Sequence, residues 1–310
     1  MAKTDASRYV RIVKKTGALG RFTSERARAD YDAAYQRGLD ALPAPDEVVD
    51  VGTGFGTVRC YRFGAPGPNP VLLLPGRAGG VVMWEPNLPA FAGSRPVYAL
   101  DLLGEPGRSV QTAPVRTAAD QAAWLVDVLE RLDLRGAHLL GYSFGGWLAA
   151  NLALRAPERL ASLVLVDPVQ TFARFPVQLL LRSALSVLPV VQRWGRPAFL
   201  RWIAGGAEVE PGDPVATVIN EGIRTYRIAL PTPVPFTDEQ LRGLAVPALA
   251  LIAGRSVLHD ARRAAARAER FGVRAEVWET ATHAIAGERA DEVNTRVLAF
   301  WSEVEASRRG

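Results

Sequence analysis

The chain has 310 residues, of which 48% are hydrophobic and 22% are charged, and its formal net charge is +5. It is long and apolar enough for one large folded domain, and this composition excludes an intrinsically disordered chain. The mild basic excess forms no stripe interleaved with aromatic residues, so nucleic acid is not an expected partner.

The single cysteine, Cys60, excludes an intramolecular disulfide. It lies within an alternating strand pattern, which predicts a packed rather than a reactive thiol. No stretch reaches the ~20 predominantly apolar residues of a membrane span, and the first residues lack the apolar core of a signal peptide. We therefore expect a cytoplasmic protein without stable membrane insertion. The sequence leaves the oligomeric state open.

The first part of the chain predicts an extension, a helix and a hairpin. Residues 1–22 are polar and basic and are expected to fray. Residues 24–40 carry apolar side chains at helical spacing, with Ser24 as the N-cap. Two strands, at 48–51 and 57–63, flank a glycine-rich turn and predict a β-hairpin.

The run 49–56 has an alternative interpretation. It is similar to the glycine-rich loop of methyltransferases that bind S-adenosylmethionine. Such a loop must open a helix, whereas here the run opens the alternating strand 57–63. The hairpin interpretation is therefore favoured.

From residue 71 onward, buried strands alternate with helices. Continuous apolar runs, typical of strands covered on both faces, occur at 71–74, 97–100, 137–140, 163–166 and 248–252. They are separated by helical patterns near 116–133, 144–155 and 259–271, and the chain ends with a strand at 275–278 and a helix at 289–306. This alternation predicts an α/β fold with a mostly parallel central sheet and helices on both faces.

Residues 169–244 interrupt this alternation, because they contain no buried-strand run. We interpret this segment as a helical lid that would exclude water and shape a substrate pocket. The α/β core then consists of residues 46–168 and 245–310, and residues 1–45 form an N-terminal extension with its helix.

A candidate nucleophile follows the strand at 137–140. Ser143 is the central residue of Gly141-Tyr142-Ser143-Phe144-Gly145, and a helical segment begins directly after it. This strand–turn–helix context is the one that a Gly-x-Ser-x-Gly nucleophile elbow requires. The hydroxyl would lie at a helix N-terminus, where developing negative charge is stabilised.

The sequence offers three histidines as the base for this serine. His283 follows the last strand and so lies at the carboxyl edge of the sheet, where open α/β sheets bind ligands. His138 opens the strand before the elbow and is interpreted as structural. His259, at the start of a helix, is interpreted as a surface residue. We therefore expect His283 to be the base.

Two aspartates could orient His283 and stabilise its charged form. Asp167 ends the strand after the elbow helix, and Asp260 follows the strand at 248–252. Both lie at carboxyl ends of strands, so position alone does not decide between them. The amides of Phe144 and Arg77 are the expected donors of an oxyanion hole.

Residues 70–306 resemble the α/β-hydrolase superfamily, particularly its esterase, lipase and haloperoxidase-like branches. The resemblance depends on the elbow and on the segments 74–76, 98–109, 157–160 and 282–283. Two features depart from the family pattern. Pro75-Gly76 replaces the usual His-Gly before the oxyanion loop, and Val257 stands where the commonest acid would be. Some branches carry the acid at the position that Asp167 matches, so the resemblance favours Asp167 over Asp260.

The resemblance implies a serine hydrolase that cleaves an ester-type bond of a fairly apolar small molecule through an acyl-enzyme. No cofactor and no metal are expected. Aromatic residues expected to line the pocket are Trp84, Phe172, Phe175, Trp194 and Tyr226. The alternative is the same fold used for acyl transfer, lactonisation, or a lyase or cyclase reaction, since fold alone does not specify chemistry.

Overall fold

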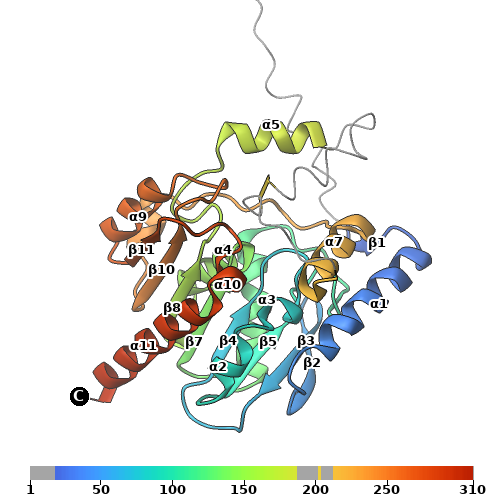
Figure 1. Cartoon of the computed structure of the whole chain (residues 1–310). Helices are drawn as coiled ribbons and strands as arrows, with labels where there is room; N and C mark the ends of the chain where they lie inside the picture. The colour runs from blue at the N-terminus through green and yellow to red at the C-terminus, as the bar shows by residue number, and fades with distance from the viewer. Residues whose placement is uncertain (1–17, 187–201, 204–211, 310) are drawn as a thin grey trace, which may run out of the picture.

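The computed structural model describes residues 18–186, 202–203 and 212–309, and a twisted central sheet organises them (Figure 1). In the described residues this sheet has nine strands in the order β11-β10-β8-β7-β4-β5-β3-β2, with β6 paired to β3. The strands are β2 (Glu47–Thr53), β3 (Gly56–Phe63), β4 (Val71–Leu74), β5 (Val97–Leu100), β6 (Val110–Gln111), β7 (Ala137–Tyr142), β8 (Leu160–Val166), β10 (Ala248–Ala253) and β11 (Arg274–Trp278). Along the part of the sheet ordered β11-β10-β8-β7-β4-β5, every neighbouring pair is parallel, which confirms the predicted fold class.

Helices cover both faces of this sheet (Figure 1). They include α2 (Leu88–Ala92), α3 (Ala118–Arg131), α4 (Phe144–Ala153), α9 (Ala261–Arg270), α10 (Ile285–Glu288) and α11 (Ala290–Arg309), with the short 3-10 helices η2 (Val81–Trp84) and η3 (Pro157–Arg159). None of the helices in the described ranges is long and apolar enough to cross a membrane.

Two separate apolar clusters form the core, one on each face of the sheet. Leu72 and Leu74 of β4 pack into the cluster of α3, α4 and α9. Val71 and Leu73 pack into the cluster of α2 and α11 on the other face. Successive side chains of a strand point to opposite faces, so a strand buried on both faces has a continuous apolar sequence.

The hairpin predicted in the first part of the chain is confirmed. Strands β2 and β3 pair antiparallel from Glu47–Arg62 to Thr53–Gly56. The glycine-rich turn thus opens a strand, and the methyltransferase alternative is wrong. Cys60 in β3 is buried, as predicted. Burial, with a smaller contribution from nearby acidic charges, raises the pKa of its thiol to about 12, so the thiol is unreactive at neutral pH.

The N-terminal helix, α1 (Glu25–Asp40), is confirmed with Ser24 as its N-cap. The expectation that residues 1–22 fray is wrong for β1 (Arg21–Phe22), which pairs with β9 (Tyr226–Arg227). Helix α1 packs along α7 (Pro214–Thr225). On its core side, the Tyr35 hydroxyl donates to the buried carboxylate of Asp101, at the end of β5.

The described part of residues 169–244 consists of helices joined by irregular loops, with no strand longer than the two residues of β9. It contains α5 (Val177–Ser186), α7 and α8 (Asp238–Arg242), and Figure 1 shows α5 above the carboxyl ends of the sheet strands. Hydrogen bonds tie the segment to the core. The Trp147 indole donates to the Val234 carbonyl over 2.9 Å, and the Arg267 guanidinium donates to the Phe236 carbonyl over 2.7 Å.

Candidate active site

Ser143 occupies a strained turn between β7 and α4. Its backbone has φ 55° and ψ −114°, a conformation that is costly for a residue with a side chain. Glycines make the turn possible. A Cβ at Gly145 would lie 2.1 Å from the Leu74 carbonyl oxygen, and one at Gly141 would lie 2.2 Å from the Gly145 carbonyl oxygen. The close approach leaves the serine at the carboxyl edge of the sheet with its hydroxyl at the N-terminus of α4.

The structure brings Ser143, His283 and Asp167 into one hydrogen-bonded chain. His283 Nε2 lies 2.9 Å from Ser143 Oγ, and His283 Nδ1 lies 2.6 Å from Asp167 Oδ2. A carboxylate only accepts hydrogen bonds, so Nδ1 carries the proton and Nε2 is free to accept one. The imidazole is therefore in the tautomer that a general base requires.

Local contacts fix the His283 loop between β11 and α10. The Tyr142 hydroxyl donates to the His283 carbonyl over 2.5 Å, and the two rings stack with centroids 5.3 Å apart. Burial, reinforced by the charge of Asp167, raises the pKa of Tyr142, so it remains a donor at neutral pH. The Thr282 hydroxyl donates to Glu288 over 2.8 Å. Tyr142, which directly precedes the nucleophile candidate in sequence, thus also fixes the position of His283.

Asp167 lies at the end of β8, fully buried, with φ 41°. Burial alone raises the pKa of this carboxyl group. The charge and hydrogen bond of His259, together with the hydrogen bond and charge of His283, outweigh that effect and hold the pKa well below its usual range. Asp167 is therefore ionised at neutral pH.

His259 is not the surface residue that its sequence position suggested. It is 6% exposed, and its Nε2 lies 2.8 Å from Asp167 Oδ1. The sequence signal that we overlooked is the loop that carries His259. This loop follows the core strand β10 at the sheet edge where Asp167 also lies. A polar residue in such a loop is more often part of the site than one chosen only because a helix follows it.

Asp260, the alternative acid, is not brought to His283, whose two ring nitrogens already contact Asp167 and Ser143. Instead it is the N-cap of α9 and accepts a hydrogen bond from the Arg263 amide over 3.0 Å. Its side chain is 55% exposed, as expected for a surface cap.

The loop from β4 to η2 brings further backbone donors near Ser143. The Gly76 amide donates to Met83 Sδ over 3.1 Å and the Ala78 amide to Glu105 Oε2 over 3.3 Å. Between them, the amide of Arg77 has no protein acceptor among the described residues. The Arg77 guanidinium lies 4.1 Å from the centroid of the Phe144 ring, so this loop contacts the first turn of α4.

A buried acid supports this loop. Glu105 forms an ion pair of 2.9 Å with Arg77, and its side chain is only 2% exposed. Burial raises the pKa of Glu105, and Arg77 and the Ala78 amide oppose that shift. Glu105 therefore links the guanidinium and the backbone of the loop to the core.

The predicted pocket aromatics lie in different environments. Trp84 and Phe172 are buried in the two core clusters, so neither is an open pocket wall. Phe175 is partly buried against the core, and Tyr226 belongs to β9, where its ring forms a T-shaped pair with Phe22. Trp194 lies outside the described residues. Among the residues that the structure describes, no group of three or more His, Cys, Asp or Glu side chains is arranged to hold a metal ion.

Comparisons with known proteins agree on one fold. The family model of the alpha/beta hydrolase fold matches residues 69–204. The chain is 31% identical over 277 residues to carboxylesterase YbfK of Bacillus subtilis, an alignment that covers 86% of this chain and 92% of that protein. The crystal structure of naproxen esterase (carboxylesterase NP) from Bacillus subtilis is similar with a TM-score of 0.82 and 28% identity, covering 91% of this chain and 100% of that one. Carboxylesterase CesB (YbfK) gives a TM-score of 0.81 at 29% identity, covering 89% and 98%.

Proposed function

This chain belongs to the α/β-hydrolase family, and on that premise we propose that it is a carboxylesterase with Ser143 as its nucleophile. The observation that carries the proposal is the hydrogen-bonded chain from Ser143 through His283 to Asp167 at a strained strand–helix turn. A nucleophile, a base in the correct tautomer and a buried ionised acid are the parts that acyl transfer by a covalent route requires.

The reaction proceeds through an acyl-enzyme. His283 Nε2 takes the hydroxyl proton as Ser143 Oγ attacks the ester carbonyl carbon. The resulting oxyanion is stabilised by the amides of Phe144 and Arg77. His283 then gives the proton to the leaving alkoxide, and the alcohol departs. A water molecule, deprotonated by His283, attacks the acyl-enzyme and releases the carboxylic acid and the free serine.

A fairly apolar small-molecule ester is the proposed substrate, and residues 169–244 are its proposed lid. The described helix α5 of this segment lies above the carboxyl ends of the strands (Figure 1), which supports that role. Phe175 and Tyr226 are proposed to contribute to the binding region. A cytoplasmic location is proposed as well, supported by a chain whose one cysteine is buried and reduced.

The proposal is tested by labelling with a fluorophosphonate and by hydrolysis of p-nitrophenyl esters of graded chain length, with a naproxen ester added because one relative is a naproxen esterase. We expect the wild type to be labelled and active. Ser143→Ala should lose both properties, whereas Ser162→Ala, in the buried strand β8, should keep them. Failure of the wild type to react with fluorophosphonate at neutral pH would falsify the proposal. Labelling without hydrolysis of any ester would favour the acyltransfer alternative instead.

A further inference from the structure

We propose that His259 is a positioning residue for this reaction: it donates a hydrogen bond to the catalytic acid Asp167 and seals that acid from a neighbouring cavity. The inference rests on the proposed function, since it assigns Asp167 its role beside His283. It adds a second histidine, from another loop, that acts through the acid and not on the substrate.

The carboxylate of Asp167 accepts two hydrogen bonds on each oxygen. On Oδ1 the donors are the Ala253 amide, at 2.9 Å, and His259 Nε2, at 2.8 Å. On Oδ2 the donors are the Ser256 hydroxyl, at 2.7 Å, and His283 Nδ1, at 2.6 Å. A carboxylate cannot donate, so His259 must carry its proton on Nε2. The four donors fill the accepting capacity of the group and fix the plane in which it meets His283.

Three of these four donors come from the end of β10 and the loop that follows it. Strands β10 and β8 are adjacent and parallel, with Leu251 paired to Val166, and the Asp167 amide donates to the Leu251 carbonyl over 2.7 Å. This register puts the first residues after β10 beside the acid. Ser256 and His259 therefore contact Asp167 from the loop after β10. The acid of that loop, Asp260, caps α9 and does not contact His283.

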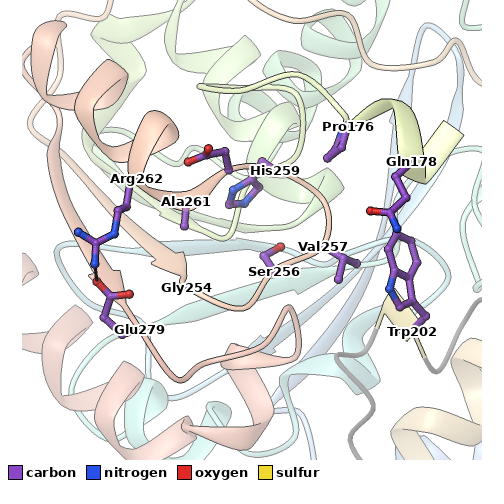
Figure 2. A pocket seen from close by; sticks show the side chains of 11 residues that line it. Pro176, Gln178, Trp202, Gly254, Ser256, Val257, His259, Ala261, Arg262 and Glu279 are labelled. Atoms are coloured by element: carbon purple, nitrogen blue, oxygen red, sulfur yellow. Dashed lines mark hydrogen bonds and ion pairs between the residues drawn. The ribbon is translucent and has the colours of Figure 1, made fainter.

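His259 is also one of the residues that line a cavity beside Asp167. The cavity has a volume of about 520 Å³, and in the view of Figure 2 His259 and Ser256 lie at its centre, between the pair Arg262–Glu279 and the side chains of Gln178 and Trp202. The His259 side chain is only 2% exposed, and Asp167 behind it is fully buried. Within the described part of the chain, Nδ1 of this ring has no hydrogen-bond partner. The imidazole is therefore a wall between the cavity and the acid, held through one nitrogen.

Two consequences of removing this imidazole are expected. Among the described residues, Oδ1 would then keep only the Ala253 amide as a donor, so the carboxylate could turn away from His283. Water from the cavity could also reach the carboxylate and weaken its interaction with the imidazolium formed during catalysis. Both effects act on the transition state and not on substrate binding, so kcat should fall while KM stays unchanged.

The test compares His259→Phe, which fills the space without a donor, with His259→Gln, whose amide nitrogen can reach the position of Nε2. We expect His259→Phe to lower kcat about 10- to 100-fold, the range for a hydrogen bond to a charged group, with KM within about twofold. His259→Gln should recover to within about threefold of wild type. In the wild type, the downfield proton resonance of the His283–Asp167 hydrogen bond should be sharp. It should broaden or shift in the Phe variant only.

The cavity allows a rescue experiment. In His259→Ala, imidazole can enter through the cavity and donate to Asp167, so millimolar imidazole should restore part of kcat. The matched control is His138→Ala, which removes an equally buried imidazole that contacts Ser162 and Glu305. It should lower stability, leave kcat unchanged and show no response to imidazole.

Equal kcat for wild type and a folded His259→Phe, with fluorophosphonate labelling intact, would overturn this inference and leave the esterase proposal standing. Absence of labelling and hydrolysis in the wild type would instead remove the esterase proposal itself. A kcat that falls equally in the Phe and Gln variants, without imidazole rescue of the Ala variant, would show a packing role and also overturn the inference.

Discussion

Two serine–histidine–carboxylate clusters lie at opposite ends of strand β7. At the carboxyl end, Ser143, His283 and Asp167 are joined by contacts of 2.9 and 2.6 Å. At the amino end, His138 Nδ1 lies 2.7 Å from the Ser162 hydroxyl and its Nε2 lies 3.1 Å from Glu305. Both clusters have the residue types and distances of a catalytic triad.

The surroundings separate the two clusters. Ser162 is fully buried within strand β8, where the register with β7 shifts by one residue, and its histidine is fully buried as well. Glu305 is shared with Arg95 over 2.8 Å, so its charge is already balanced. Ser143, by contrast, lies on a strained turn at a helix N-terminus, next to the loop in which the Arg77 amide has no protein acceptor among the described residues. A serine acts as a nucleophile when its hydroxyl is accessible and when backbone donors can stabilise the oxyanion. Hydrogen-bond distances alone are not sufficient.

The largest expected effect comes from the acids of the two clusters. Asp167→Asn should lower kcat about 10⁴-fold, because an amide would favour the wrong tautomer of His283. Glu305→Gln should leave kcat within about threefold of wild type. Steady-state kinetics on one p-nitrophenyl ester, with circular dichroism to verify folding, measures both. Similar losses in the two variants would erase the distinction drawn between the clusters.

The tight turn at Ser143 gives the next largest effect. In Gly145→Ala the new methyl group would meet the carbonyl oxygens of Leu74 at 2.1 Å and Pro75 at 2.5 Å. The backbone must shift, so we expect a loss of about 1–3 kcal/mol in unfolding free energy and about 100-fold in kcat as the oxyanion donors separate. Urea unfolding and ester kinetics test these values.

The control for the turn is Gly287→Ala in α10, where a Cβ would have nothing within 4 Å. It should be neutral or slightly stabilising, because alanine is the better helix former. If Gly145→Ala were as harmless as this control, the position of Ser143 would not depend on the close contact between α4 and the loop after β4.

The elbow and the α/β alternation could be predicted because they depend on local patterns. Apolar runs mark strands buried on both faces, and glycines around Ser143 mark a turn that only small residues allow. His283 followed from its place after the last strand. These features need no knowledge of which side chains meet across the sheet.

The partners of Asp167 other than His283 could not be predicted, because they depend on contacts between separate loops. His259 precedes an N-cap and so resembled a surface residue, yet the pairing of β10 with β8 carries it to the acid. The same limit applies to Trp84 and Phe172, since aromatic residues near a site pack into the core as readily as they line a pocket. The pairing of Arg21–Phe22 with β9 was also invisible, as two-residue strands have no periodicity.

A smaller expected effect is a pH dependence of stability that arises from His138 in the amino-end cluster. Burial, only partly offset by Glu305, lowers the pKa of His138 to about 4, from 6.5 for an exposed imidazole. The unfolded chain therefore takes up a proton below about pH 6.5 that the folded chain refuses until about pH 4. Stability should fall as pH falls through this window, by at most about 3 kcal/mol.

Urea midpoints measured from pH 7 to pH 4 test this expectation against His138→Gln, which cannot titrate. The difference in unfolding free energy between wild type and variant should shrink towards low pH. A difference that stays constant across the window would mean that the amino-end cluster is not held neutral.

The smallest expected effect concerns Asp260, which follows His259 in the chain but has a largely exposed side chain. Its carboxylate caps α9 through the Arg263 amide, so Asp260→Ala should cost about 1 kcal/mol of stability and leave kcat unchanged. Asp260→Asn, which preserves a capping oxygen, should cost less. A fall of several orders of magnitude in the kcat of Asp260→Asn would move the catalytic acid from β8 to this loop. The hydrogen-bonded chain from Ser143 through His283 to Asp167 would then not be the catalytic arrangement.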